Sequence, residues 1–261
     1  MTTSPTETSI PKTALVTGGN RGLGRSSALH LAASGVDVIL TYRSHPEEAE
    51  AVVAQIRDTG RRAAALRLDT GRPEDFAAFA QTVRSTLAAS FGPETLDILV
   101  NNAGHSRQTP IGDTRLEDVR SLLDVHIVGT VMLTEALLPL LADGGRIVNT
   151  SSGLARFTGD GGSSVYAATK GAVEVYTRYL AKALGPRRIT ANTIAPGVVG
   201  TDFGGGTNRD NEHVRDGLSK LIAMGRIGEP DDIGAAVAAI ASDSMGWVTG
   251  QRIEASGGML L

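Results

Sequence analysis

The residue pair that most directly suggests chemistry is Tyr166 and Lys170, at the ends of the segment Tyr166-Ala-Ala-Thr-Lys170. On a helix, residues four positions apart lie on the same face, one turn from each other. A neighbouring ammonium favours the phenolate form of tyrosine, so we expect Lys170 to lower the pKa of Tyr166. A tyrosine tuned in this way exchanges a proton near neutral pH, as carbonyl–alcohol chemistry requires. The alternative is a surface tyrosine beside a solvated lysine.

A glycine-rich turn near the start of the chain gives this pair its context. An apolar run, Thr13–Thr17, is typical of a buried strand, and Gly18-Gly-Asn-Arg-Gly-Leu-Gly24 separates it from an amphipathic stretch that ends near Ser34. A strand, a glycine turn and a helix in this order form a dinucleotide-binding unit, because glycine lets the backbone approach a pyrophosphate and the helix N-terminus supplies free N–H groups. The spacing G-x-x-x-G-x-G differs from G-x-G-x-x-G, and the alternative is a surface loop without a ligand.

Four motifs in this order resemble the short-chain dehydrogenase/reductase family. The segment 17–24 is similar to the family's T-G-x-x-x-G-x-G signature, and Asn101-Asn-Ala-Gly104 to its N-N-A-G segment. Tyr166 and Lys170 match Y-x-x-x-K, and Pro196-Gly197 matches the P-G turn. The resemblance runs from about residue 12 to 258 and includes the 3-oxoacyl-[acyl-carrier-protein] reductase-like members. It implies an α/β fold, a single-domain Rossmann-like doubly wound parallel sheet of seven strands with helices on both faces.

Strand-like and helix-like segments alternate along the chain, which also predicts a mostly parallel sheet covered by helices on both faces. We expect residues 1–10 to form a disordered tail and residues 11–261 to form one NAD(P)-binding domain. A glycine-rich polar insertion at 204–211 is either a lid over substrate or an ordinary surface loop. The expected strands are 12–17, 36–42, 62–68, 96–101, 145–150, 188–194 and 251–254, and the expected helices are 22–34, 46–60, 73–90, 114–141, 163–184 and 230–242.

Composition narrows the class of protein. A chain of 261 residues with 41% apolar content can build one substantial core. The absence of cysteine excludes disulfides and thiolate metal sites, and the five histidines show no metal-ligand spacing, so we expect no metal. A net charge of −3 gives no electrostatic case for nucleic acid or a membrane surface. We expect no apolar run of the length of a membrane span, and the N-terminus is polar, so we expect a cytoplasmic protein with a small-molecule partner.

The end of the second expected strand bears on the choice of nicotinamide cofactor. In dinucleotide folds a carboxylate at this place holds the ribose 2′-hydroxyl of NAD, whereas an arginine accommodates the 2′-phosphate of NADP. By alignment to the family, the acidic position holds Tyr42, Arg43 follows it, and Arg21 in the glycine turn adds a second cation. Two guanidinium groups suit a phosphate dianion, so we expect NADP(H). The alternative is that Arg43 is a solvated charge at a strand end.

The resemblance implies further contacts with the cofactor. It places Asp69 at the adenine amino group, the segment 102–104 along the cofactor, and Thr201 at the carboxamide or phosphates. The full implied set is Gly18, Asn20, Arg21, Gly22, Leu23, Gly24, Tyr42, Arg43, Asp69, Thr70, Asn102, Ala103, Gly104, Thr150, Tyr166, Lys170, Pro196, Gly197, Val199 and Thr201.

The resemblance also implies a catalytic set. Ser152, at the end of the fifth strand, polarises the substrate oxygen, and Ser151 is the alternative because the gap from Ser152 to Tyr166 is one residue longer than usual. Tyr166 protonates the alkoxide that forms when NADPH delivers hydride, and Lys170 lowers its pKa while binding the nicotinamide ribose. Donors directed at a developing oxyanion are worth several kcal/mol.

His126 departs from the family pattern, because Val125-His-Ile-Val-Gly129 lies where the family has V-N-x-x-G. The family asparagine kinks the helix and holds a water that links the lysine to solvent. Histidine can also donate, accept and relay protons, so we place His126 in the catalytic set and expect a rate dependence near a histidine pKa. The alternatives are a tolerated substitution with a rerouted water, or lost activity.

These residues predict an NADP(H)-dependent reductase of ketones or dehydrogenase of secondary alcohols. Leu141-Ala-Asp-Gly-Gly145, the expected end of the long helix, lacks the basic residues with which carrier-protein reductases of the family often dock their acidic partner. This weakens a fatty-acid role and leaves a free small ketone or a natural-product intermediate open. A cofactor-binding regulator or scaffold with weak turnover is the alternative. Family members are usually homotetramers joined through the helices 114–141 and 163–184, and Ala172, Val173, Val175 and Leu180 fit either such a face or the core.

Overall fold

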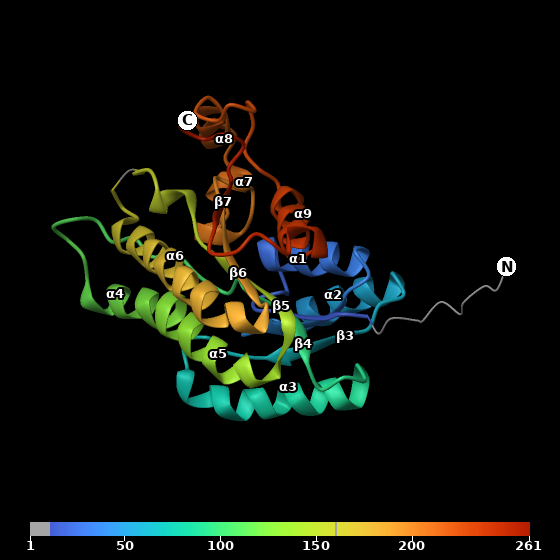
Figure 1. The fold of residues 1–261 in the computed structure, drawn as a ribbon. Coiled ribbons are helices and arrows are strands. Elements are labelled where there is room, and N and C mark those ends of the chain that lie inside the picture. Colours follow the sequence, from blue (N-terminus) through green and yellow to red (C-terminus); the bar gives the residue numbers. More distant parts are fainter. Residues whose placement is uncertain (1–10, 160) are drawn as a thin grey trace.

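Seven parallel strands form one sheet in the order β3-β2-β1-β4-β5-β6-β7 (Figure 1). A computed structural model describes residues 11–159 and 161–261, so the expected tail 1–10 lies outside the described residues. Every strand pairs in parallel with its neighbours. The strands are β1 (Thr13–Val16), β2 (Asp37–Tyr42), β3 (Ala63–Arg67), β4 (Leu96–Asn101), β5 (Leu141–Thr150), β6 (Thr190–Pro196) and β7 (Arg252–Ala255). The expected doubly wound sheet is confirmed.

Helices cover both faces of this sheet, with α1, α2 and α9 on one side and α3 to α6 on the other (Figure 1). Short helices α7 and α8 lie at the carboxyl edge of the sheet, beside the end of the chain (Figure 1). The helices are α1 (Gly22–Ala33), α2 (Pro46–Asp58), α3 (Phe76–Ser90), α4 (Leu116–Leu123), α5 (Gly129–Leu137), α6 (Ser164–Leu184), α7 (Thr207–Asp210), α8 (Glu212–Ser219) and α9 (Pro230–Ile240).

The side chains of the central strands alternate between two apolar cores. Ala14 and Val16 of β1 belong to the core under α1, α2 and α9, whereas Leu15 points into the core under α3, α5 and α6. On β2, Leu40 belongs to the core under α1, α2 and α9, and Ile39 belongs to the core under α3, α5 and α6. Because both faces of a parallel sheet are covered, such strands read as continuous apolar runs, which is why the sequence located them well.

The long helix expected over 114–141 is interrupted in the middle. A π-helical turn, Asp124–Val128, separates α4 from α5 and contains His126. Gly129, the next residue, lies so close to Thr70 that an added Cβ would come within 2.3 Å of the Thr70 carbonyl oxygen. A π-helical turn therefore lies where the family asparagine would kink the helix, although the residue here is histidine, and close packing at Gly129 accompanies it.

The end of this helix and the start of β5 differ from the expected boundaries, and the insertion after β6 contains helical turns that were not expected. The helix ends at Leu137 and β5 already begins at Leu141, so Leu141–Asp143 belong to a strand and not to a helix end. The register with β4 shifts where this extension turns at Gly144, whose φ is +78°. The insertion contains helical turns at Phe203–Gly205 and α7.

One stretch, Leu116–Leu140, is long and apolar enough by length and composition to cross a membrane, so the expectation that no segment reaches this length was wrong. Leu122, Leu133, Leu137 and Leu140 of this stretch are buried. Leu133, Leu137 and Leu140 pack in the core under α3, α5 and α6.

Candidate active site

Predicted site residues follow the carboxyl ends of six strands and meet at one edge of the sheet. The glycine turn follows β1, Arg43 follows β2, Asp69 follows β3, Asn102 follows β4, Ser152 follows β5 and Gly197 follows β6. The strand order reverses between β1 and β4, which is where ligands bind in such sheets. A cleft of about 1020 Å³ lies at this edge.

The glycine turn has no side chains at positions where its backbone comes very close to neighbouring atoms. Gly18 has φ +63°, a conformation that favours glycine, and a Cβ there would come within 3.2 Å of Ala103. A Cβ on Gly24 would lie 2.1 Å from the Gly18 carbonyl oxygen. The first residue of α1 follows Arg21, which provides no side-chain cap, and no acidic residue lies in the first turn. Free N–H groups and the positive end of the helix dipole therefore face the cleft, an arrangement that suits a phosphate.

Asn102 fastens this turn to β4. Its backbone N–H donates to Thr17 Oγ1 at 2.9 Å, and its side-chain amide donates to the Thr17 carbonyl at 2.9 Å. The backbone N–H of Ala103 donates to the same hydroxyl at 2.9 Å. The N-N-A-G segment thus supports the shape of the glycine turn as well as lining the cleft.

Most of the residues implied for the cofactor line this one cleft. Tyr42 and Gly24 do not. Tyr42 packs on the apolar core under α1, and Gly24 is buried against Gly18. The expected residues that do line it are Gly18, Asn20, Arg21, Gly22, Leu23, Arg43, Asp69, Thr70, Asn102, Ala103, Gly104, His126, Thr150, Ser152, Tyr166, Lys170, Pro196, Gly197, Val199 and Thr201.

Ser152, Tyr166 and Lys170 come together at the centre of the cleft. The Lys170 Nζ lies 5.5 Å from the centroid of the Tyr166 ring and donates to the Thr150 carbonyl at 2.7 Å. Ser152 forms a hydrogen bond with the Tyr166 hydroxyl. Ser151, the alternative, is buried and its hydroxyl donates to Glu174 Oε1 at 2.6 Å. Of the two serines, Ser152 is therefore the one that contacts the phenol.

Burial controls the ionisation of this pair, and the expected lowering of the Tyr166 pKa was wrong. Removal from water raises the pKa of Tyr166 to about 12, opposed only by the hydrogen bond with Ser152. Burial also lowers the pKa of Lys170 to about 7. The charged form of each group is disfavoured by desolvation. Tyr166 is thus a protonated donor at neutral pH, while Lys170 titrates there.

His126 is 1% exposed, and its ring contacts the rings of His105 and Tyr166. Its Nε2 is 2.8 Å from the His105 carbonyl oxygen, so Nε2 carries the proton and donates. Its Nδ1 is buried and has no hydrogen-bond partner among the described residues. Burial first, and then the charge of Lys170, lower the pKa of His126 to about 2. His126 is therefore neutral at every physiological pH, which contradicts the expected rate dependence near an ordinary histidine pKa.

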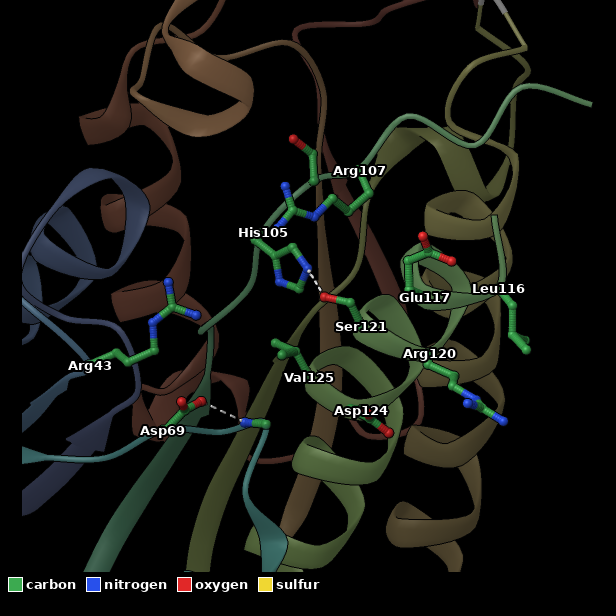
Figure 2. Close-up of a pocket in the computed structure, with 12 residues that line it drawn as sticks. Arg43, Asp69, His105, Arg107, Leu116, Glu117, Arg120, Ser121, Asp124 and Val125 are labelled. Carbon is green, nitrogen blue, oxygen red and sulfur yellow. Dashed lines mark hydrogen bonds between the residues drawn. The ribbon is translucent and has the colours of Figure 1, made fainter. Parts of the chain in front are cut away.

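Arg21 and Arg43 stand at the other end of the cleft, where the glycine turn and β2 meet. Neither guanidinium forms an ion pair within the described part of the chain. Arg43 also borders a second pocket of about 680 Å³ that continues past Asp69 toward α4 (Figure 2). In that pocket the His105 Nε2 and the Ser121 hydroxyl share a hydrogen bond of 2.9 Å (Figure 2). Two unpaired cations beside a glycine turn form a site for an anion.

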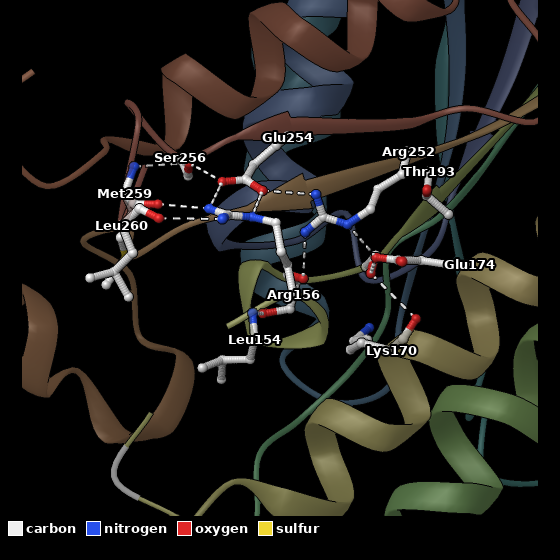
Figure 3. Close-up of polar contacts among 12 residues, drawn as sticks. Leu154, Arg156, Lys170, Glu174, Thr193, Arg252, Glu254, Ser256, Met259 and Leu260 are labelled. Atoms are coloured by element: carbon white, nitrogen blue, oxygen red, sulfur yellow. Dashed lines mark hydrogen bonds and ion pairs between the residues drawn. The ribbon is translucent and has the colours of Figure 1, made fainter. Parts of the chain in front are cut away.

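A chain of four alternating charges begins next to Ser152, whose carbonyl accepts a hydrogen bond from Arg252. Arg252 donates to Glu174 at 2.7 Å and to Glu254 at 2.8 Å, and Arg156 donates to Glu254 through two nitrogens at 2.7 and 2.8 Å (Figure 3). Arg156 also donates to the Met259 carbonyl at 2.7 Å. This charge chain links α6 to the C-terminal segment, of which Met259 and Leu260 line the cleft.

Sequence reasoning missed the apolar half of the cleft. The segment that follows β5, the helix α8 and the C-terminal residues contribute this half, and none of them carries a motif. Their apolar spacing alone does not distinguish a ligand site from core. The missed apolar residues are Leu154, Phe157, Val198, Phe203, Val214, Leu218, Leu221, Met259 and Leu260.

The site fits a dinucleotide cofactor at one end and leaves an apolar space at the other. The glycine turn excludes side chains from the place of a pyrophosphate, and the unpaired arginines face the same end. Among the described residues, no cluster of three metal-ligating side chains occurs. A proton donor and a lysine at the junction of the two ends define a dinucleotide-dependent oxidoreductase.

Comparisons with known proteins agree with this class. The family model described as Enoyl-(Acyl carrier protein) reductase matches residues 18–260. The 3-oxoacyl-[acyl-carrier-protein] reductase of Synechocystis sp. is 33% identical over 251 residues, covering 95% of this chain and 96% of the relative. The chain belongs to the short-chain dehydrogenase/reductase family.

Two solved structures support the same assignment. The promiscuous reductase LugOII, which catalyses keto-reduction at C1 during lugdunomycin biosynthesis, has a TM-score of 0.91 and 37% identity, over 97% of this chain and 99% of that one. A short-chain dehydrogenase from Burkholderia cenocepacia in complex with NADP has a TM-score of 0.87 and 38% identity, over 95% and 98% of the two chains.

Proposed function

We propose that this protein is an NADP(H)-dependent ketone reductase, or secondary-alcohol dehydrogenase, with Tyr166 as its general acid and base. The observation that carries the proposal is the meeting of Ser152, Tyr166 and Lys170 at the centre of a cleft whose far end is the glycine turn. Keto-reduction by LugOII and the 3-oxoacyl reductase activity named for the Synechocystis relative support a carbonyl substrate.

NADP(H) is favoured over NAD(H) by the cations at the cofactor end of the cleft. Arg21 and Arg43 are free to bind a 2′-phosphate, and no carboxylate occupies the end of β2, where Tyr42 stands. The Burkholderia structure, which holds NADP, supports the same choice. The first turn of α1 and the Asn102 segment would hold the remainder of the cofactor.

The residues divide the chemistry among them. When bound, the nicotinamide cofactor supplies the hydride. Tyr166, whose pKa of about 12 keeps it protonated at neutral pH, donates its proton to the oxygen of the reduced carbonyl. Ser152 donates a hydrogen bond to the same oxygen and orients it. Lys170, when charged, stabilises the phenolate that Tyr166 becomes. Burial keeps Tyr166 protonated before the reaction but raises the cost of forming the phenolate, and the ammonium offsets part of that cost.

Replacement of Tyr166 by phenylalanine tests the proposal. Phe keeps the ring that packs on His126 and Phe203 but removes the donor. We expect kcat for NADPH-dependent ketone reduction to fall about 10³-fold or more, at the upper end for a positioned acid. NADPH binding, followed by its fluorescence, should persist. An undiminished rate would contradict the assignment.

A cofactor-binding regulator or scaffold is the second candidate, and His126 is the observation that favours it. Its pKa of about 2 excludes proton exchange by this side chain at neutral pH. NADPH binding by the wild-type protein without turnover of any ketone in a broad panel would favour this candidate.

The proposal includes a cytoplasmic homotetramer that acts on free small ketones and not on nucleic acid or membranes. Of the four residues considered for a helix interface, Val173 and Leu180 are core, whereas Ala172 and Val175 are exposed. Exposed Leu123 and Met132 on α4 and α5 and Tyr179 on α6 add to an apolar surface on the same helices. Light scattering of the purified protein measures its mass, and a monomer would contradict the tetramer.

A further inference from the structure

The half of the cleft beyond Tyr166 is largely apolar. Among the described residues that line the whole cleft, the lysines and arginines are Arg21, Arg43 and Lys170, at the cofactor end and the catalytic centre. The titratable residues of the outer half are Asp202, which forms an ion pair with Arg209, and His213 on α8. A carboxylate or phosphate on the reacting part of the substrate would find no lysine or arginine there, so this half suits an uncharged molecule.

The floor of this half is an apolar cluster separate from the two cores of the sheet. Ile222, Ile227 and Met259 form its buried centre, and Phe157, Val198 and Leu218 pack against it. A Cβ on Gly153 would lie 2.7 Å from the Phe157 ring, so glycine at this position leaves room for that ring. The floor is thus wide and partly aromatic.

Phe203 stands over this floor and next to the proton donor. Its ring centroid lies 5.7 Å from that of Tyr166 with an angle of 52° between the rings, and 43% of its side chain is exposed. The three residues that follow, Gly204, Gly205 and Gly206, all have positive φ, between +68° and +85°. The aromatic ring is therefore followed by a segment whose backbone conformation favours glycine, and it both contacts Tyr166 and lines the cleft.

The open ring distinguishes between two kinds of apolar substrate. Aliphatic and aromatic molecules gain equally from the removal of apolar area from water. Only a planar aromatic molecule gains further from offset stacking on a ring face at centroid distances of about 4.5–7 Å. A leucine floor and wall would serve aliphatic substrates as well, so an aromatic side chain half-exposed beside the acid points to a planar partner.

We propose that the substrate is an uncharged ketone whose carbonyl is attached to an aromatic ring system, and that this ring system stacks on Phe203 while the carbonyl oxygen faces Ser152 and Tyr166. This inference rests on the proposed ketone-reductase function. It makes Phe203 the residue that selects planar substrates over saturated ones of the same size.

A matched pair of bicyclic ketones tests it. 1-Tetralone and trans-1-decalone have the same carbon skeleton, but only the first contains a planar aromatic ring. NADPH oxidation gives kcat/KM for each ketone with the wild-type protein and with Phe203→Leu, which keeps the apolar character but removes the ring face. The two carbonyls differ in intrinsic reactivity. This difference cancels when the ratio of kcat/KM for 1-tetralone to kcat/KM for trans-1-decalone is compared between the two proteins.

We expect the ratio of kcat/KM for 1-tetralone to kcat/KM for trans-1-decalone to fall at least threefold in Phe203→Leu, mainly because KM for tetralone rises. The same ratio should be retained in Phe203→Tyr. Trp247→Leu is the matched control, because this aromatic residue is 98% exposed and does not line the cleft. Its ratio should equal that of the wild type. A fall of less than threefold in Phe203→Leu would overturn the role of Phe203.

Two further outcomes separate this inference from the proposed function. If Phe203→Leu does not fold by circular dichroism, competitive inhibition of the wild type decides, and 2-naphthol must inhibit at least threefold more tightly than trans-2-decalol. Equal inhibition overturns the inference. Turnover of both ketones with an unchanged ratio overturns the aromatic preference alone, whereas no NADPH oxidation with either ketone or with a broad ketone panel overturns the proposed function itself.

Discussion

The imidazole of His126 stands edge-on to the phenol ring of Tyr166, with ring centroids 5.3 Å apart and 85° between the planes. His126 packs on one part of the Tyr166 ring, and Phe203 contacts another. Because the His126 Nε2 donates to the His105 carbonyl, the imidazole cannot turn without losing that bond. His126 therefore acts in this structure as a neutral, rigid neighbour of the acid and not as a group that gains or loses protons.

The pH dependence of reduction should follow Lys170 and not His126. Burial places the Lys170 pKa at about 7, so the ammonium that stabilises a Tyr166 phenolate is lost as pH rises through that value. The kcat/KM for NADPH reports groups of the cofactor-free protein, and we expect it to fall above about pH 7. His126→Asn should keep this midpoint because the imidazole, with a pKa of about 2, is neutral throughout.

Lys170→Arg provides the complementary measurement. A guanidinium does not deprotonate in this range, so the fall between pH 6 and 9 should disappear even if the absolute rate is lower. A midpoint that moves with His126→Asn, or a fall that persists in Lys170→Arg, would assign the titration to another group.

His126 and Gly104 should depend on each other. A Cβ on Gly104 would lie 2.6 Å from the His126 Cε1, a separation that real atoms do not adopt. We expect Gly104→Ala to destabilise the wild type by about 1–3 kcal/mol, as overpacking does. In a His126→Ala background the same change should cost less by at least about 1 kcal/mol, measured by urea unfolding in a double-mutant cycle. Additive effects would show that the clash is relieved elsewhere.

The parts of the fold that sequence reasoning located share one physical property. Strands buried on both faces read as apolar runs, so β2 and β4 were found to within a residue. The break at Asp124–Val128 was not found as a change of helix type, because a π-turn depends on how the helix meets Thr70 and α6 and not on local propensity. The short α8 was missed because its mostly polar sequence follows a glycine run and offers only two apolar residues, Val214 and Leu218, over eight positions.

In the candidate site too, some features were predicted from the sequence and others were missed. Motifs with required backbone geometry, such as Gly18 and Gly24, were identified because only glycine fits there. The ionisation of Tyr166 was misjudged, because spacing reveals a neighbouring lysine but not the depth of burial that outweighs its charge. The aromatic wall at Phe203 was missed because its place depends on how the C-terminal segment and α8 fold over the cleft.

Removal of the Arg43 guanidinium should change the preference between cofactors. Arg43 lines the cofactor cleft without an ion-pair partner in the described chain, so it is free for a phosphate. Since hydrogen bonds to charged groups are worth about 1.5–3 kcal/mol, Arg43→Ala should raise KM for NADPH about 10- to 100-fold with little change for NADH. Arg61→Ala, which removes an arginine at the opposite edge of the sheet, is the control for net charge. Equal effects on both cofactors, or equal effects of both substitutions, would refute this role.

The charge chain next to Ser152 predicts a specific acid sensitivity. Arg156 above all, together with Ser256 and Arg252, lowers the pKa of Glu254 to about 2, from 4.5 in the unfolded chain. A carboxylate with a lowered pKa stabilises the fold above pH 4.5, and this stability is lost as pH falls toward 2. Glu254→Gln should therefore cost about 2–3 kcal/mol in unfolding free energy at pH 7, and the difference from wild type should shrink as the pH approaches 2, followed by urea unfolding. Because Arg156 also donates a hydrogen bond to the Met259 carbonyl, Glu254→Gln should raise KM for ketones more than KM for NADPH.

Glu117→Gln, at an exposed pair with Arg115, is the control, and it should change neither the unfolding free energy nor KM for ketones. A stability difference that is constant with pH would show that Glu254 contributes by packing and not by its charge.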